Sequence, residues 1–196
     1  MLPFSEACER NKAPILEVLA VALADREQVL EIGSGTGQHA VHFAMHLPHL
    51  IWHPTEQLMY LTDLGARVKL EGPRNLRAPT LLDVQQSVWP LRSADAAFTA
   101  NTLHIMSWPQ VTAMYRGLSA LLPSGGSLCV YGPFRYEGRY TSASNQNFDR
   151  MLQERDPQSG LRDISDVSAL AAQHGLRLRD DHDMPANNRL LEFIKD

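Results

Sequence analysis

Three closely spaced glycines after a short strand-like run constrain the fold of this chain more than any other feature of its sequence. Residues 29–32 form a largely apolar run of strand length, Gly33, Gly35 and Gly37 follow, and a helical pattern begins at Gln38. Glycine permits positive φ and lets a ligand approach the backbone, while the N-terminus of the following helix presents free N–H donors. The run therefore predicts a ligand-binding turn between a strand and a helix, with a ligand-free tight turn as the alternative.

The spacing of these glycines discriminates between two cofactors. A dinucleotide-binding loop has the pattern G-x-G-x-x-G, whose last glycine would stand at Gln38. Here the third glycine comes one residue earlier, and the acidic Glu31 stands two residues before the first. This variant resembles the S-adenosylmethionine loop of class I methyltransferases, in which the acidic side chain helps to orient the loop and the methionine end of the cofactor. The resemblance implies S-adenosylmethionine as the cofactor, held by Glu31, Gly33, Gly35, Thr36 and Gly37.

Acidic residues also stand at the ends of two further strand patterns. Glu56 follows the second pattern and Asp83 ends the third. The carboxyl ends of parallel strands meet at one edge of a sheet, where ligands bind. A carboxylate at Glu56 suits the two hydroxyls of a ribose, and Asp83 or the neighbouring backbone of Val84 suits an adenine amino group. Each carboxylate taken singly also fits a solvated loop. With Asn101 at the end of the fourth strand pattern, these residues complete the expected cofactor site.

Strand-like and helix-like periodicity alternate along most of the chain. Strand patterns occupy residues 29–32, 49–53, 80–84, 96–101 and 127–131, and helix patterns lie between them at 38–47, 57–69 and 109–121. Such alternation predicts an α/β fold with a parallel sheet covered by helices on both faces. Pro54 is expected to end the second strand. Residues 177–182 and 189–194 are joined by too short a link for a parallel crossover, so they predict a C-terminal antiparallel hairpin.

Length and charge limit the organisation of the chain and its partners. The 196 residues, 44% of them hydrophobic, suit a single domain over residues 1–196, with an N-terminal helical segment at 1–28. The net charge of −4 disfavours binding to nucleic acid or anionic membranes. The apolar residues 13–24 are too few to span a bilayer. With only two cysteines, Cys8 and Cys129, we expect no disulfide framework and a cytoplasmic location.

Residues after the fourth and fifth strand patterns are the candidates for contact with a methyl acceptor. His104 is the candidate base or acceptor-orienting group, and a structural histidine packed against Trp108 is the alternative. Residues 135–165 are a candidate lid over the acceptor site, and a surface loop leading into a helix is the alternative. The residues expected to contact the acceptor are His39, Arg139, Tyr140, Ser142, Asn145 and Asn188.

Several histidines raise the question of a metal site. His39, His42 and His46 share one face of a predicted helix. A zinc site needs a carboxylate or thiol at matching distance as well, but the chain contains no H-E-x-x-H motif and neither cysteine is near these histidines. We therefore expect no metal, and we expect His39 to face the cofactor or acceptor.

A set of short motifs over nearly the whole chain resembles the domain-of-unknown-function 938 family, which includes methyltransferase-like protein 26. The matching stretches are Phe4-Ser5, Glu9 to Lys12, Leu30 to His39 (LEIGSGTGQH), Trp52 to Glu56, Leu82 to Val84, Ala100 to Ile105, Tyr131 to Phe134, Thr141 to Asn145, Arg162-Asp163 and Met184 to Asn188. Glu56 departs from the aspartate expected in the family, which changes reach and not chemistry. The resemblance implies a class I methyltransferase fold, which is Rossmann-like, with a mostly parallel seven-stranded sheet.

These observations favour an S-adenosylmethionine-dependent methyltransferase that acts on a small-molecule acceptor. The small-molecule preference follows from the lack of a basic stripe or an aromatic-rich platform for nucleic acid. A non-catalytic module that binds S-adenosylmethionine, S-adenosylhomocysteine or a protein on the same fold is the alternative. An NAD-dependent oxidoreductase is disfavoured by Gln38, and a protein or nucleic-acid methyltransferase has little support. The sequence indicates no particular protein partner.

Overall fold

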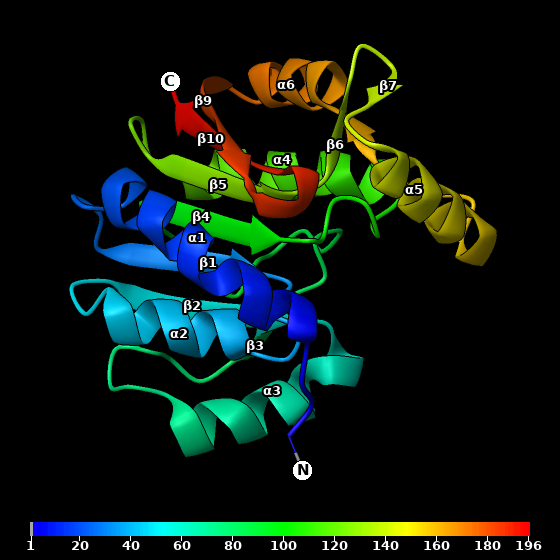
Figure 1. Ribbon diagram of the computed structural model, residues 1–196. Coiled ribbons are helices and arrows are strands. Elements are labelled where there is room, and N and C mark those ends of the chain that lie inside the picture. Colours follow the sequence, from blue (N-terminus) through cyan, green and yellow to red (C-terminus); the bar gives the residue numbers. More distant parts are fainter. Residues whose placement is uncertain (1) are drawn as a thin grey trace.

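A computed structural model describes residues 2–196, and its centre is a seven-stranded sheet with the strand order β3-β2-β1-β4-β5-β10-β9 (Figure 1). β10 is antiparallel to both β5 and β9, and the pairs among the first five strands are parallel. The predicted α/β fold with a mostly parallel sheet and a C-terminal antiparallel hairpin is confirmed. The strands are β1 (Gln28–Ile32), β2 (Ile51–Glu56), β3 (Thr80–Leu81), β4 (Ala96–Ala100), β5 (Ser127–Gly132), β9 (Leu176–Met184) and β10 (Asn188–Lys195).

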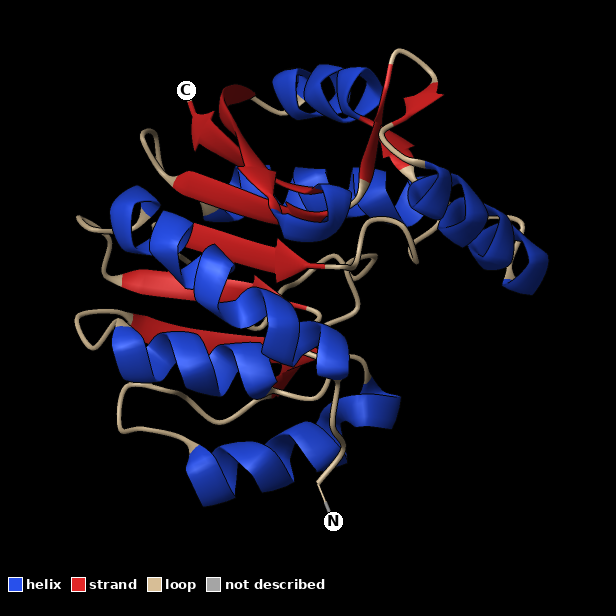
Figure 2. Cartoon of the chain, viewed as in Figure 1, coloured by secondary structure: helices blue, strands red, loops and turns tan. Residues whose placement is uncertain are grey.

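Helices cover both faces of this sheet (Figure 2). Successive side chains of a strand point to opposite faces, so each strand contributes to two cores. Val29 joins the apolar core beneath α1 and α2, whereas Leu30 joins the core beneath α4 and α6. In the part of the chain that is described, no helix is both long and apolar enough to cross a membrane. The helices are α1 (Glu6–Ala22), α2 (Gln38–His46), α3 (Leu58–Glu71), α4 (Trp108–Leu121), α5 (Ala143–Arg155) and α6 (Ile164–Gln173).

The second strand does not end at Pro54, as the sequence had indicated, but continues through it to Glu56. Trp52 and Glu56 exchange backbone hydrogen bonds with the segment on the β3 side. The backbone groups of residues two apart in a strand face the same side, so the missing N–H of Pro54 faces the β3 side, as the N–H of Trp52 does. Position 54 lies between the contacts of Trp52 and the start of the pairing with β3 at Thr55. Proline is tolerated where no ladder partner is required.

The third strand is shorter than predicted, because the chain turns at Asp83. The carboxylate Oδ1 of Asp83 accepts a hydrogen bond of 2.9 Å from the Gln85 backbone N–H, and its carbonyl accepts one of 3.0 Å from Gln86. Aspartate commonly forms such turns. The residues after Leu81 therefore leave the sheet at the edge where ligands bind in parallel sheets.

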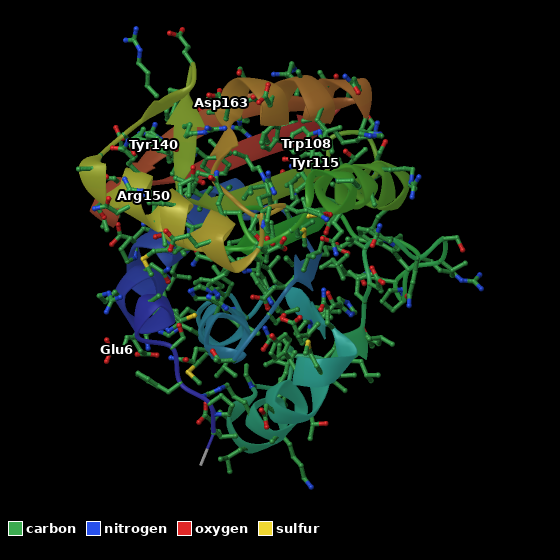
Figure 3. All side chains as sticks on the ribbon, turned by 90° about the vertical axis from the view of Figure 1, so that its right-hand side faces the viewer. Glu6, Trp108, Tyr115, Tyr140, Arg150 and Asp163 are labelled. Carbon is green, nitrogen blue, oxygen red and sulfur yellow. The ribbon has the colours of Figure 1, made fainter. Side chains whose placement is uncertain are left out.

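The segment proposed as a lid contains a small second sheet that the sequence analysis did not predict. Its strands are β6 (Phe134–Tyr136), β7 (Arg139–Tyr140) and β8 (Arg162–Asp163), in the order β7-β6-β8. Strands of two or three residues are too short to show a periodicity. α5 connects β7 to β8 and, as Figure 3 shows, crosses in front of the edge where the parallel strands end.

Candidate functional site

A cavity of about 1390 Å³ opens at the carboxyl ends of the parallel strands. Residues from the loops after β1, β2, β4 and β5 line it, together with residues of α1 and α5. Cavities that hold one small ligand usually measure about 300–1,000 Å³. The volume is therefore sufficient for a cofactor and a second small molecule.

The three glycines of the loop after β1 have different structural roles. All have positive φ, at 73° for Gly33, 53° for Gly35 and 77° for Gly37. A Cβ at Gly33 would lie 2.5 Å from a methyl carbon of Thr102, and one at Gly37 would lie 2.7 Å from Leu64 Cδ1. A Cβ at Gly35 would meet nothing within 4 Å. The outer glycines thus allow tight packing, and the middle one leaves open space beside its backbone in the cavity.

Glu31 supports this loop from behind and does not line the cavity. Its carboxylate accepts hydrogen bonds from the Ser34 hydroxyl at 2.8 Å and from the Trp52 indole N–H at 2.9 Å. Burial raises the pKa of Glu31 to about 7, while these two donors act in the opposite direction. The contact with Ser34 connects the carboxylate to the loop itself, so Glu31 orients the turn between β1 and α2.

Glu56 lies on the wall of the cavity at the end of β2. One carboxylate oxygen accepts the backbone N–H of Gly35 at 2.7 Å, and the other accepts that of Gln57 at 2.7 Å. Asp83, by contrast, uses its carboxylate in the turn after β3, and its neighbours Leu82 and Val84 line the cavity in its place. Unlike Asp83, Glu56 therefore presents its carboxylate on the cavity wall, which Asp63 of α3 also lines.

Asn101 and His104 converge at the other end of this edge. Asn101 has a left-handed backbone with φ of 58°. A Cβ built on Gly132, at the end of β5, would lie 3.8 Å from Nδ1 of His104 and 3.9 Å from Oδ1 of Asn101. The loop after β4 thus brings an amide and an imidazole together beside the end of β5.

The His104 ring packs edge-to-face on Phe148 of α5, with 5.2 Å between ring centroids. Trp108, considered above as its packing partner, lies instead against the Arg162 guanidinium. Burial first, and then the charge of Arg162, lower the pKa of His104 to about 4, and Asp149 opposes both. The ring is therefore neutral near pH 7 and can accept a proton.

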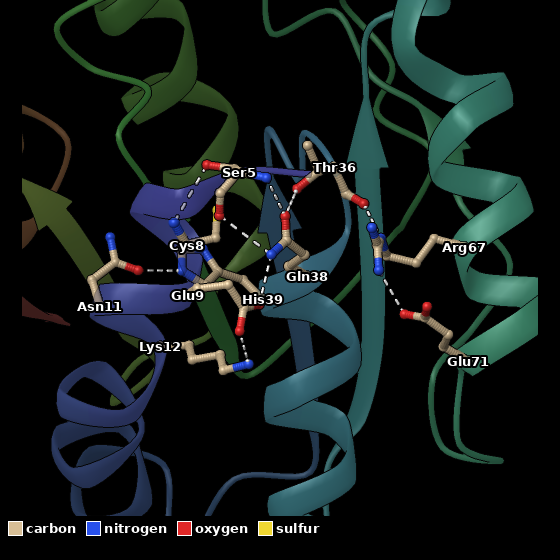
Figure 4. A network of polar contacts seen from close by, with 10 residues as sticks. All are labelled: Ser5, Cys8, Glu9, Asn11, Lys12, Thr36, Gln38, His39, Arg67 and Glu71. Atoms are coloured by element: carbon tan, nitrogen blue, oxygen red, sulfur yellow. Dashed lines mark hydrogen bonds and ion pairs between the residues drawn. The ribbon is translucent and has the colours of Figure 1, made fainter. Parts of the chain in front are cut away.

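His39 is the second buried histidine beside the cavity, and it lies under α1. Its Nε2 lies 2.7 Å from Oδ1 of Asn11 (Figure 4). Its ring stacks on that of Phe43. Burial lowers the pKa of His39 to about 4. Both His39 and Asn11 line the cavity. The pair forms part of the cavity wall on the side covered by α1.

Gln38 fastens α1 over the glycine loop. Its Oε1 accepts the Ser5 backbone N–H at 2.6 Å, and its Nε2 donates to a Glu9 carboxylate oxygen at 2.6 Å (Figure 4). Arg67 of α3 adds bonds to the carbonyls of Thr36 and Pro3, at 2.6 Å and 2.5 Å. Glycine, which a dinucleotide loop would place at position 38, has no side chain for this contact.

Most of the predicted cofactor residues line the cavity, and half of the predicted acceptor residues line it as well. The cofactor candidates on the cavity wall are Gly33, Gly35, Thr36, Glu56, Val84 and Asn101, and those off it are Glu31, Gly37 and Asp83. Among the acceptor candidates, His39, Asn145 and Asn188 line the cavity, and Arg139, Tyr140 and Ser142 do not. Tyr140 donates to Asp149 at 2.6 Å, and Ser142 caps α5.

Several cavity residues were missed because nothing local marks them. Cys8, to which the sequence analysis assigned no place in a site, lines the cavity together with Asn11 because α1 begins at Glu6 and lies across the loop. Tyr131 and Phe148 reach the cavity from β5 and α5. The one signal for Asn11 was its place in a stretch that matches the family.

Within residues 2–196, one group of metal-ligating side chains gathers closely, and it does not line the cavity. It consists of Asp180, His182 and Glu192 on the hairpin of β9 and β10. The Arg179 guanidinium lies 3.3 Å from Glu192 and 3.4 Å from Asp180. An arginine already pairs with both carboxylates, so the group is accounted for as an ion-pair network.

Solved methyltransferases share this fold over nearly the whole chain. An O-methyltransferase family protein from Burkholderia thailandensis matches with a TM-score of 0.83 and 14% identity, over 97% of this chain and 58% of that chain. A family 2 O-methyltransferase from Planctomyces limnophilus, solved with apigenin, matches with a TM-score of 0.84 and 16% identity, over 97% and 58%. Human N-acetylserotonin methyltransferase, solved with S-adenosylmethionine, matches with a TM-score of 0.75 and 16% identity, over 99% of this chain and 60% of that chain.

The fold is therefore that of the class I methyltransferases, as the motifs implied. The chain spans less than two thirds of the length of these structures. Within this fold, the chain belongs to the DUF938 family, described as protein of unknown function, which matches residues 2–195.

Proposed function

We propose that the protein is an S-adenosylmethionine-dependent methyltransferase that acts on a small-molecule acceptor. The observation that carries the proposal is a single cavity with the Gly35 backbone and Glu56 at one end and Asn101 and His104 at the other. The methyltransferase neighbours support it, because two of them were solved with S-adenosylmethionine and apigenin. The fold alone does not assign a reaction.

The residues at the first end fit an adenosine-containing cofactor. The open space beside Gly35 lets a ligand approach the backbone, and Glu56 offers carboxylate oxygens that already face the loop. The apolar Leu82 and Val84 form a wall for a flat ring on the same side. S-adenosylmethionine, when bound, supplies a methyl group that is already activated as a sulfonium. The protein therefore has to hold the two reactants close together and exclude water.

The second end suits an acceptor that loses a proton. His104 is neutral near pH 7, and within residues 2–196 no group hydrogen-bonds to its ring. A ring nitrogen is therefore free to take a proton from an acceptor hydroxyl or amine. Asn101 and Asn145 provide amides that can orient the acceptor, and Phe148 provides an apolar surface.

Transfer of a labelled methyl group tests this function. The protein is incubated with S-adenosylmethionine labelled in the methyl group and with a cell extract separated into small molecules and macromolecules. We expect label in a small-molecule product with the wild-type protein, and a strong loss with His104→Gln. Label that enters only protein or nucleic acid would contradict the choice of acceptor. Cofactor binding without transfer to either fraction would favour the non-catalytic module.

A further inference from the structure

The loop that carries His104 is irregular and has few bonds of its own. It joins β4 to α4, and its internal backbone contacts are those of Ile105 and Met106 to the Thr102 carbonyl, at 3.0 and 3.1 Å. Thr102 is fixed through its hydroxyl, 2.5 Å from that of Thr99. The part of the loop beyond Thr102 therefore depends on contacts from elsewhere in the chain.

Residues 159–162, which lead into β8, donate hydrogen bonds to the four successive backbone carbonyls of residues 103–106. Gly160 donates its backbone N–H to the His104 carbonyl at 2.8 Å, and the Ser159 hydroxyl donates to that of Ile105 at 3.2 Å. Arg162 donates from Nε to the Leu103 carbonyl at 3.1 Å and from Nη2 to the Met106 carbonyl. A single guanidinium thus binds the backbone on both sides of His104.

Arg162 is engaged by carbonyls and not by an acidic partner. No carboxylate in residues 2–196 forms a salt bridge with it, and it also donates to the Gln158 carbonyl at 2.9 Å. Its guanidinium carbon lies 5.8 Å from the centroid of the Trp108 ring. Arginine has a rigid fork of donors, whereas lysine has a point charge on a flexible stem, so only arginine can bridge Leu103 and Met106 in this way.

We propose that Arg162 is a positioning residue that holds the His104 loop against the cavity. The inference rests on the proposed function, because His104 is the group that it positions. Two charged groups face His104: Arg162 from β8, and Asp149 from α5. The cation of Arg162 also disfavours a second positive charge on the nearby ring, which keeps the imidazole in its neutral form.

The test combines an NMR titration of His104 with kinetics, in the wild type, Arg162→Gln and Arg162→Lys. The His104 signal is assigned by its absence in His104→Gln. In Arg162→Gln we expect His104 to titrate at higher pH and kcat to fall about tenfold or more. In Arg162→Lys the charge stays and the fork is lost, so we expect kcat to fall while the titration of His104 changes less. S-adenosylmethionine affinity should stay within about twofold in both.

Two controls separate this effect from general damage. Arg150→Gln, on the exposed face of α5, should change neither readout. Ser159→Ala removes one of the four contacts and provides a milder variant should Arg162→Gln fail to fold. An unchanged His104 titration and kcat in Arg162→Gln or Ser159→Ala would overturn the proposal. If the wild type transfers no methyl group at all, the proposed function fails, and the titration still decides whether Arg162 acts on His104.

Discussion

The Gly35 backbone N–H donates a hydrogen bond of 2.7 Å to the Glu56 carboxylate and so joins the turn after β1 to the end of β2. Two features that lie 21 residues apart in the sequence are thereby fixed to each other at the edge of the sheet. The polar wall of the proposed cofactor end is thus held by hydrogen bonds within the protein. Binding there requires little rearrangement of the backbone, which favours affinity.

Replacement of Gly35 should affect binding more than folding. Gly35→Ala strains a residue with φ of 53° and places a methyl group in the open space of the cavity. Gly138→Ala is the matched control, because Gly138 has φ of 75°, has open space beside it, and lies outside the cavity. We expect each variant to lose about 1 kcal/mol of stability. Only Gly35→Ala should weaken S-adenosylmethionine binding, by about tenfold or more. Equal affinities in calorimetry would contradict the role of Gly35.

Glu56 and Asp83 looked equivalent in the sequence, and the structure predicts that they differ. Glu56→Gln removes the charge from a group on the cavity wall, and a lost charged hydrogen bond lowers affinity about ten- to a hundredfold. Asp83→Asn changes a turn outside the wall and should alter affinity less than about twofold. Titration calorimetry of both variants checks this. A larger loss for Asp83→Asn would place the adenosine contact at β3.

The buried His39 and His104 should make the protein sensitive to acid. Each has a folded-state pKa lowered to about 4 from 6.5, so the unfolded chain binds more protons between these values. Stability from each histidine is complete above about pH 6.5 and is lost as the pH falls toward 4. Glu31, whose pKa is raised to about 7, acts in the opposite direction and loses its contribution as the pH rises.

A comparison of variants isolates the contribution of one histidine. Between about pH 7 and pH 4.5, the wild type should lose about 2 kcal/mol more stability than His104→Gln, as measured by urea unfolding. The exposed His46→Gln serves as a control and should follow the wild type. Parallel curves for His104→Gln and the wild type would show that His104 is not held neutral.

Gln38 should control the docking of α1. Gln38→Ala removes the bonds to the Ser5 N–H and to Glu9, together with the bond of 3.0 Å that the Thr36 hydroxyl donates to Gln38 Oε1. We expect faster hydrogen exchange in the first turns of α1, with little change in the core strand β5. We also expect that Gln38→Gly, which creates the G-x-G-x-x-G spacing of a dinucleotide-binding loop, does not lead to NAD binding. Unchanged exchange in α1 would contradict the role of Gln38.

The sequence predicted the parts of this molecule that rest on periodicity and local chemistry. The alternation of strands and helices, the hairpin, and the loop from Gly33 to Gly37 follow from local rules. The different fates of Glu56 and Asp83 depend on where β3 ends, which is set by a turn and not by residue type. The place of Asn11 in the cavity depends on how α1 crosses the sheet, and the contacts of Arg162 join segments 56 to 59 residues apart. Such long-range packing leaves no local pattern.

The most direct test is calorimetric titration of the purified protein with S-adenosylmethionine, S-adenosylhomocysteine and NAD. The structure predicts saturable, near-stoichiometric binding of the first two and no binding of NAD. A folded protein that binds NAD alone, or none of the three, would contradict the account, because the Gly35 loop and Glu56 would then not be a cofactor site.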